Sequence, residues 1–274
     1  MIVYPNCKIN LGLHILGKRD DGFHDLETVF YPVEINDALE IIQHSDGEAG
    51  QLDFTTTGIT LDGRIEDNIC YKAWQLIKED YPSLPSLKIH LHKAIPAGAG
   101  LGGGSADGSF CLRLLNRKCN LSIPEDKLFE YAVRLGSDCS FFLFNKPCIA
   151  SGRGEKLEPI DLDLSAYKIA LVIPPVHINT AWAFGQLKSY KKHPPIRDLI
   201  QEPVSKWKDL LHNDFEEVVF AKYPEIKQVK EQLYAEGAIY ASLSGSGSSV
   251  FALFEAETTL PLSFPPTYFV KLLG

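Results

Sequence analysis

The chain has 274 residues, of which 45% are hydrophobic and 23% charged, as in a folded globular protein with one large domain or two closely associated ones. Its formal net charge of −8 excludes a general nucleic-acid-binding protein, which needs a basic face, but not a local basic pocket. There is no signal-peptide pattern, no apolar run long enough to span a membrane, and no C-x-x-C pair among the six cysteines. We therefore expect a cytoplasmic protein with free thiols and no membrane partner.

The first third of the chain is rich in predicted strands. Apolar patterning predicts strands over residues 7–17, 28–43, 52–57 and 87–95, and helices over residues 68–80, 105–117 and 124–135. Further along, the pattern predicts a hairpin at 148–159, a buried strand at 167–173, helices at 206–219 and 224–236, and a hairpin at 238–254. Residues 188–203 match no pattern and are expected to form a surface excursion. The predicted domains are residues 1–155 and 156–274.

A glycine-rich run, PAGAGLGGGSAD from Pro96 to Asp107, lies between a predicted strand and a predicted helix. Glycine allows backbone N–H groups to approach an anion closely, and a helix N-terminus adds positive potential. The run therefore predicts a phosphate-binding loop. It lacks the acidic residue of the dinucleotide fingerprint, and Gly104 stands where a P-loop has lysine. Any cation for the phosphates must come from elsewhere in the fold.

Three weaker signals stay open on the residues alone. Lys8 and Asn10 share one face of the first predicted strand, where a lysine usually points to solvent or protects an edge. The turn SGSGSS, residues 244–249, allows a close approach either by a ligand or by another backbone segment. His90 and His92 share a strand face, a pattern more typical of a solvated face than of a metal site.

Three motifs in this order resemble those of the GHMP small-molecule kinases: P-x-x-K-I-N-L from Pro5, P-x-x-x-G-L-G-G-G-S from Pro96, and S-G-S-G from Ser244. The segments RDDGFHDLET (19–28) and GSDCSFF (136–142) are similar to members that phosphorylate the 2-hydroxyl of 4-diphosphocytidyl-2-C-methyl-D-erythritol, in the non-mevalonate route to isoprenoids. The resemblance covers about residues 3–254. It implies an α+β fold with an N-terminal ribosomal-S5-like α/β domain and a C-terminal ferredoxin-like α/β sandwich. The active site would lie in the cleft between them.

The resemblance also implies roles for individual residues. Asp138 matches the catalytic base, and Lys8 matches the residue paired with that base. ATP would bind at Asn68, Lys93 and the loop residues Pro96, Ala97, Gly98, Ala99, Gly100, Leu101, Gly102, Gly103, Gly104, Ser105 and Ala106, and Ser105 would also help to hold Mg²⁺. The alcohol substrate would contact Asn10, Phe23, His24, Phe184, Ser244, Gly245, Ser246 and Gly247. His24 would read the cytosine edge, with Phe23 and Phe184 stacked on the ring. The protein would be a monomer or a weak homodimer.

The chain departs from many relatives at several positions. Ala99 replaces a glycine, and Ala106 and Asp107 replace Ser-Asn, which brings a carboxylate near the triphosphate. Phe23 stands in place of tyrosine and Ser140 in place of proline, and none of these changes removes a catalytic group.

Other functions remain as alternatives. One is a GHMP kinase for mevalonate, homoserine or a sugar, although the Gly-Phe-His segment suits a nucleobase. The other is an inactive ligand-sensing relative, although both Lys8 and Asp138 are retained. Without the ordered motifs, Asp138 would be interpreted as a turn cap, His24 as a surface histidine and Phe184 as a core residue.

Overall fold

The computed structural model describes residues 1–44, 49–259 and 263–274. The chain forms two compact units, each assembled from several stretches of sequence. Unit 1 consists of Met1–Lys8, Pro32–Ala97 and Gly102–Lys146, and unit 2 of Ile9–Tyr31, Gly98–Leu101 and Pro147–Gly274. Each unit is discontinuous in sequence, whereas the predicted domains are continuous stretches. The domain boundary near residue 155 stays a prediction.

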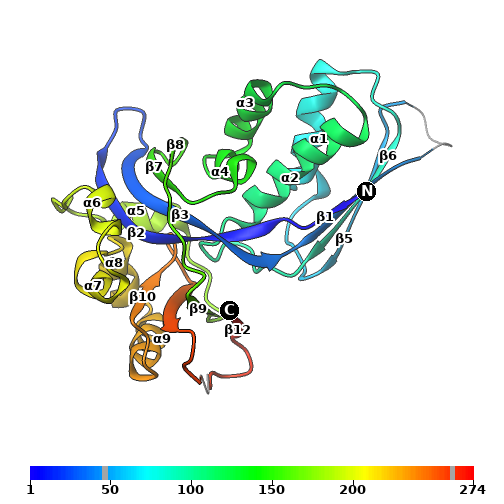
Figure 1. Ribbon diagram of the computed structural model, residues 1–274. Helices are drawn as coiled ribbons and strands as arrows, with labels where there is room; N and C mark the ends of the chain where they lie inside the picture. The colour runs from blue at the N-terminus through cyan, green and yellow to red at the C-terminus, as the bar shows by residue number, and fades with distance from the viewer. Residues whose placement is uncertain (45–48, 260–262) are drawn as a thin grey trace. The chain divides into compact units, whose positions relative to one another are not determined.

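Unit 1 contains a four-stranded sheet covered by helices. The strand order is β1-β4-β6-β5, with β4 antiparallel and β5 parallel to β6. Its strands are β1 (Ile2–Val3), β4 (Ala38–Gln43), β5 (Leu52–Gly58) and β6 (Leu87–Lys93), and its helices are the 3₁₀ turn η1 (Ile65–Asp67), α1 (Ile69–Asp80), α2 (Gly103–Lys118), α3 (Glu125–Leu135) and α4 (Cys139–Phe144). Figure 1 shows the helices on one side of this sheet, where α2 packs against β4 and against the other three α-helices.

The alternation of β6 separates the core of unit 1 from its outer face. Ile89 and Leu91 are buried in one apolar cluster with Leu112 of α2. His90 and His92 point to the other face, where they make hydrogen bonds with threonines of β5. Among the residues that the structure describes, no group of three His, Cys, Asp or Glu side chains is arranged to hold a metal ion.

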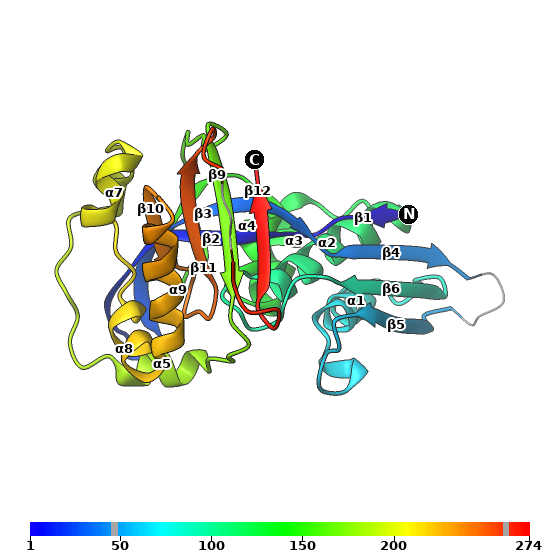
Figure 2. The same ribbon diagram turned by 90° about the horizontal axis from the view of Figure 1, so that it is seen from below.

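Unit 2 contains an antiparallel sheet with the strand order β10-β11-β9-β12. The strands are β9 (Tyr167–Ile173), β10 (Tyr240–Leu243), β11 (Val250–Glu255) and β12 (Phe269–Leu273), and the helices are α5 (Thr180–Gln186), α6 (Ile196–Ile200), α7 (Val204–Leu210), α8 (Phe215–Lys222) and α9 (Pro224–Ala235). Helix α9 lies across β10 and β11 and contacts α8 (Figure 2). The central strand β11 is buried at every position from Val250 to Phe254, so both of its faces are covered.

A third sheet has the order β2-β3-β7-β8. Its strands are β2 (Asn6–Lys18), β3 (His24–Asn36), β7 (Cys148–Gly152) and β8 (Lys156–Pro159). The chain passes from unit 1 to unit 2 within β2 and returns within β3. Strand β2 is buried without interruption from Asn6 to Ile15, and Lys8 is only 3% exposed. The interpretation of Lys8 as a solvated or edge-protecting lysine is therefore wrong.

Two predicted elements are interrupted by buried polar side chains. The strand expected over residues 28–43 is divided into β3 and β4 at Asp37, whose Oδ1 accepts hydrogen bonds from the N–H groups of Ala94 and Ile95 at 2.6 and 2.9 Å. The helix expected over residues 206–219 is divided into α7 and α8. Between them, the side chains of Asn213 and Asp214 accept hydrogen bonds from backbone N–H groups, which competes with helix formation.

The expected surface excursion, residues 188–203, contains α6, and Ile196 within it is fully buried. Strand β12 was not predicted either. All six cysteines are free thiols, and five of them are buried. No helix in the described ranges is long and apolar enough to cross a lipid bilayer.

His14 of β2 makes stability depend on pH. Its side chain is fully buried, its ring stacks on that of His193 at 3.9 Å, and its two ring nitrogens have no hydrogen-bond partner among the described residues. Burial, with a contribution from His193, lowers the pKa of His14 from 6.5 to about 4. As the pH falls through this window, the unfolded chain binds a proton that the folded protein excludes, so the free energy of unfolding decreases. Between pH 6.5 and pH 4 we expect the free energy of unfolding to decrease by about 3 kcal/mol.

His14→Phe should remove this contribution, since phenylalanine is apolar and does not titrate. Urea unfolding of both proteins at several pH values between 7 and 4 would measure the difference. Parallel pH dependence in the variant and the wild type would contradict the assignment to His14.

Candidate active site

The glycine-rich run, residues 96–107, follows β6, as the sequence predicts: residues 96–102 form the glycine loop, and residues 103–107 form the start of α2. Gly98, Gly100 and Gly102 have φ angles of +67°, +82° and +68°, a region that other L-residues rarely adopt. Ala99 lies between two of these positions and has no positive φ, so the departure from the glycine pattern is tolerated. Helix α2 begins directly after Gly102, and the N–H groups of its first turn have no partner within the helix. Such a helix start favours anions.

In unit 2 the serine-glycine turn, residues 244–249, holds the first part of this loop. Ser244 Oγ donates a hydrogen bond to the Gly100 carbonyl at 2.8 Å, and the backbone N–H of Ser249 donates to the Ala99 carbonyl at 3.1 Å. A Cβ at Gly100 would lie 2.0 Å from the Ser244 carbonyl oxygen. The turn therefore allows another backbone segment to come close, which was one of the two possibilities that the sequence left open. Its Ser246 hydroxyl forms a hydrogen bond with Thr180 at 2.9 Å.

Within unit 1, Lys8 and Asp138 form an ion pair, with Lys8 Nζ 3.4 Å from Asp138 Oδ2. The lysine side chain is 4% exposed, whereas the aspartate is 32% exposed and is open to a ligand. Asp138 precedes α4 at the N-cap position, but its carboxylate makes no capping hydrogen bond. The arrangement is a solvent-accessible carboxylate beside a buried ammonium.

A second lysine, Lys93 at the end of β6, is buried between two carboxylates. Its ammonium donates to Asp37 and, at 2.7 Å, to Asp107 Oδ2, and all three side chains are at most 2% exposed. Burial alone would lower the pKa of Lys93, but Asp107 and Asp37 outweigh that effect and raise it. Burial also raises the pKa of Asp107 to about 8, against the opposing effect of Lys93. Asp107, whose carboxylate the family resemblance places near the triphosphate, is thus buried and paired with Lys93.

Four of the residues predicted to bind ATP line one cavity in unit 1. The cavity holds about 280 Å³ and is lined by both polar and apolar side chains, the latter including Phe54 and Ile69. The four predicted residues are Asn68, Lys93, Ala97 and Gly104, and Asp107 joins them. The cavity therefore lies beside the glycine loop and combines apolar and polar lining.

On unit 2, the structure brings two predicted substrate residues together. The rings of His24 and Phe184 stack at 4.6 Å with an interplanar angle of 19°. Phe23 is 52% exposed and lies instead against the Arg153 guanidinium, 4.5 Å from its ring centre. Burial, with Lys18, lowers the pKa of His24, which favours the neutral ring.

Asn10, another predicted substrate residue, is held by hydrogen bonds within unit 2, and the structure also shows residues that the sequence did not predict. Asn10 Nδ2 donates to Thr28 Oγ1 at 3.0 Å, and its backbone N–H donates to Ser244 Oγ at 3.3 Å. Tyr190 lies 6.0 Å from the His24 ring, in the stretch that gave no sequence pattern. Asp37 could not have been found either, because its partners lie more than fifty positions away.

Two family models match the chain: the GHMP kinases N terminal domain over residues 68–146 and the GHMP kinases C terminal domain over residues 187–260. The chain belongs to the GHMP kinase family. Proteins named 4-diphosphocytidyl-2-C-methyl-D-erythritol kinase are similar to it over nearly their whole length. One from Bacteroides fragilis is 49% identical, over 94% of this chain and 93% of that protein. One from Cytophaga hutchinsonii is 45% identical, over 94% and 93%.

Solved structures agree with this assignment. The crystal structure of a 4-(cytidine 5'-diphospho)-2C-methyl-D-erythritol kinase is similar with a TM-score of 0.79 and 30% identity, covering 92% of this chain and 90% of that one. The mevalonate kinase of Methanococcus jannaschii is similar in fold, with a TM-score of 0.63 at 14% identity over 94% of this chain and 92% of that one. The predicted two-domain α+β GHMP fold and the kinase assignment are therefore confirmed.

Proposed function

We propose that this chain transfers the γ-phosphoryl group of ATP to the 2-hydroxyl of 4-diphosphocytidyl-2-C-methyl-D-erythritol, in the cytoplasm. The observation that carries the proposal is the Lys8–Asp138 pair, a partly exposed carboxylate beside a buried ammonium. The 49% identity to proteins named for that substrate supports the choice of alcohol.

Asp138 would act as the general base. As the hydroxyl oxygen forms its bond to the γ-phosphorus, the bond from phosphorus to the β–γ bridging oxygen breaks and ADP leaves. The proton of the hydroxyl passes to the Asp138 carboxylate. Lys8 would stabilise negative charge that develops on the attacking oxygen.

Kinases usually bind ATP together with Mg²⁺, whose ligands are phosphate oxygens and protein oxygens. The Ser105 hydroxyl is one oxygen of this kind. Ser105 lies in the first turn of α2. Ser109 Oγ lies 2.8 Å from the Ser105 carbonyl oxygen and 2.7 Å from that of Cys139, and its single proton is shared between them, which ties that turn to the residue after Asp138. Ser105 would supply one protein oxygen ligand beside the phosphate oxygens, and the ion would neutralise charge on the phosphates.

Turnover tests the proposal directly. We expect Mg²⁺-dependent ADP formation with the cytidylated alcohol, and at most weak activity with mevalonate or homoserine. Comparable kcat/KM for one of those acceptors, with none for the cytidylated alcohol, would reassign the substrate. Binding of both ligands without any turnover would indicate the inactive, ligand-sensing alternative.

Gly104 provides a test of the glycine loop that leaves the fold intact. An added Cβ would meet no atom within 4 Å, and the residue lines the cavity at the loop. If phosphates approach this backbone, the added methyl group would occupy space that a phosphate needs. We therefore expect Gly104→Ala to raise the Kd for ATP by about 10-fold or more. Calorimetric titration with ATP measures the effect. Gly185→Ala in α5 is the matched control, since its Cβ also enters open space. An unchanged ATP Kd in Gly104→Ala would mean that this position faces no phosphate.

His24 tests recognition of the base. We expect His24→Ala to raise KM for the cytidylated alcohol by about 10- to 100-fold, since a lost base-edge hydrogen bond costs about 1–3 kcal/mol. The Kd for ATP should change little. A loss of ATP affinity instead would place His24 at the nucleotide and refute the proposed orientation. His92→Ala, on the outer face of β6, serves as a control.

A further inference from the structure

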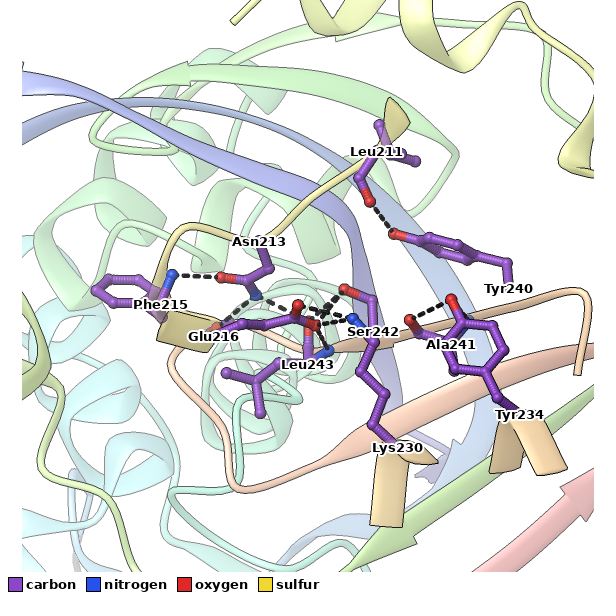
Figure 3. A network of polar contacts seen from close by, with 11 residues as sticks. Leu211, Asn213, Phe215, Glu216, Lys230, Tyr234, Tyr240, Ala241, Ser242 and Leu243 are labelled. Atoms are coloured by element: carbon purple, nitrogen blue, oxygen red, sulfur yellow. Dashed lines mark hydrogen bonds and ion pairs between the residues drawn. The ribbon is translucent and has the colours of Figure 1, made fainter. Parts of the chain in front are cut away.

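The segment between α7 and α8 contains a buried asparagine, Asn213, whose side-chain amide forms hydrogen bonds with backbone groups. Asn213 is 3% exposed, and its Nδ2 donates hydrogen bonds to the carbonyls of Leu243 at 2.8 Å and Gly245 at 2.9 Å. Its Oδ1 accepts from the N–H of Phe215 at 2.9 Å (Figure 3). An amide side chain has two N–H donors, and both are directed at the residues that flank Ser244.

Glu216, one helical turn further, holds the same end of β10. Its Oε1 accepts from the backbone N–H of Leu243 at 3.0 Å and from Ser242 Oγ at 3.2 Å, and Lys230 neutralises the carboxylate at 2.7 Å (Figure 3). Leu243 is thus fixed at its N–H by Glu216 and at its carbonyl by Asn213. The serine-glycine turn begins at the next residue, so its first peptide starts from a fixed orientation.

The serine-glycine turn is in turn hydrogen-bonded to the glycine loop, so the orientation of the turn affects that of the loop. Ser244 Oγ and the Ser249 N–H bind the carbonyls of Gly100 and Ala99. In a trans peptide the C=O and the following N–H point in opposite directions. Carbonyls held toward the turn therefore direct the N–H groups of Gly100 and Leu101 away from it. Those are the donors that a phosphate-binding loop must present.

We propose that Asn213 is a positioning residue for the nucleotide: through the serine-glycine turn it sets the peptide orientation of Ala99 and Gly100, and so the affinity for the ATP phosphates. The inference rests on the proposed function only in taking ATP as the ligand. Asn213 itself touches neither substrate in this account.

The test compares two asparagines with the same kind of backbone contact. Asn116 also bridges backbone groups, donating to the Ile123 carbonyl at 3.0 Å and accepting from the Ile123 N–H at 2.9 Å, but within unit 1. We expect Asn213→Ala to raise the calorimetric Kd for ATP by about 10- to 100-fold, since two carbonyls lose their donors. Asn116→Ala should lower the melting temperature while leaving the ATP Kd within about 2-fold.

Ser244→Ala removes the donor to the Gly100 carbonyl, together with the acceptor of the Asn10 N–H, and keeps the test decisive if Asn213→Ala does not fold. It should also raise the ATP Kd, and the double variant should lose less than the sum of both, because the two residues act in series. Wild-type ATP affinity in either folded variant overturns the inference, as does an equal loss in Asn116→Ala. The proposed function fails separately, when the wild type binds ATP but does not phosphorylate the cytidylated alcohol.

Discussion

Asp138→Asn is expected to lower kcat by a factor of about 10²–10⁴ while both substrates still bind. Asparagine keeps the shape of the side chain, but it removes the charge that faces Lys8 Nζ at 3.4 Å and the group that accepts the proton. Since Asp138 makes no capping hydrogen bond with α4, the substitution should leave that helix in place. Steady-state kinetics with both substrates varied, together with binding titrations, measures the effect. Asp126→Asn, an exposed aspartate in the first turn of α3, is a control that should keep kcat.

Lys8→Met separates two forms of the mechanism. If proton removal by Asp138 limits the rate, the two single variants should each lower kcat, and the double variant should cost less than their sum. Phosphoryl transfer also proceeds largely through positioning and electrostatics. If that contribution dominates, Asp138→Asn keeps most of the activity and Lys8→Met loses most of it. Normal turnover in both variants would place the active site elsewhere.

The second large effect concerns stability. We expect Lys93→Met to lower the free energy of unfolding by about 3–5 kcal/mol, because it leaves Asp37 and Asp107 buried without their shared cation. Urea unfolding followed by circular dichroism measures the change. Lys127 is the matched control: it also pairs with two carboxylates, Asp80 and Glu130, but it is 41% exposed. Lys127→Met should cost less than about 1 kcal/mol. An equally small decrease in the free energy of unfolding for Lys93→Met would mean that Asp37 and Asp107 together carry no net charge in that variant.

The local features of this protein were determined by the sequence itself. The strand, glycine loop and helix from Leu87 to Lys118 follow from alternation, from glycine content and from helical spacing, all of which act within a few residues. The need for glycine at 98, 100 and 102 is equally local, since it comes from the sign of φ. The order of the motifs was sufficient to predict the GHMP family and its two-domain α+β fold.

The partners of the buried polar groups were decided only by the tertiary structure. Asp37 divides a predicted strand because it meets the N–H groups of Ala94 and Ile95, and Asn213 divides a predicted helix because it bonds to residues 243 and 245. The burial of Lys8 likewise appears only when β2 is covered on both faces. A buried polar atom must find a hydrogen-bond partner, and distant segments supply it. Periodicity records which residues face inward, but it carries no information about which distant atom meets them.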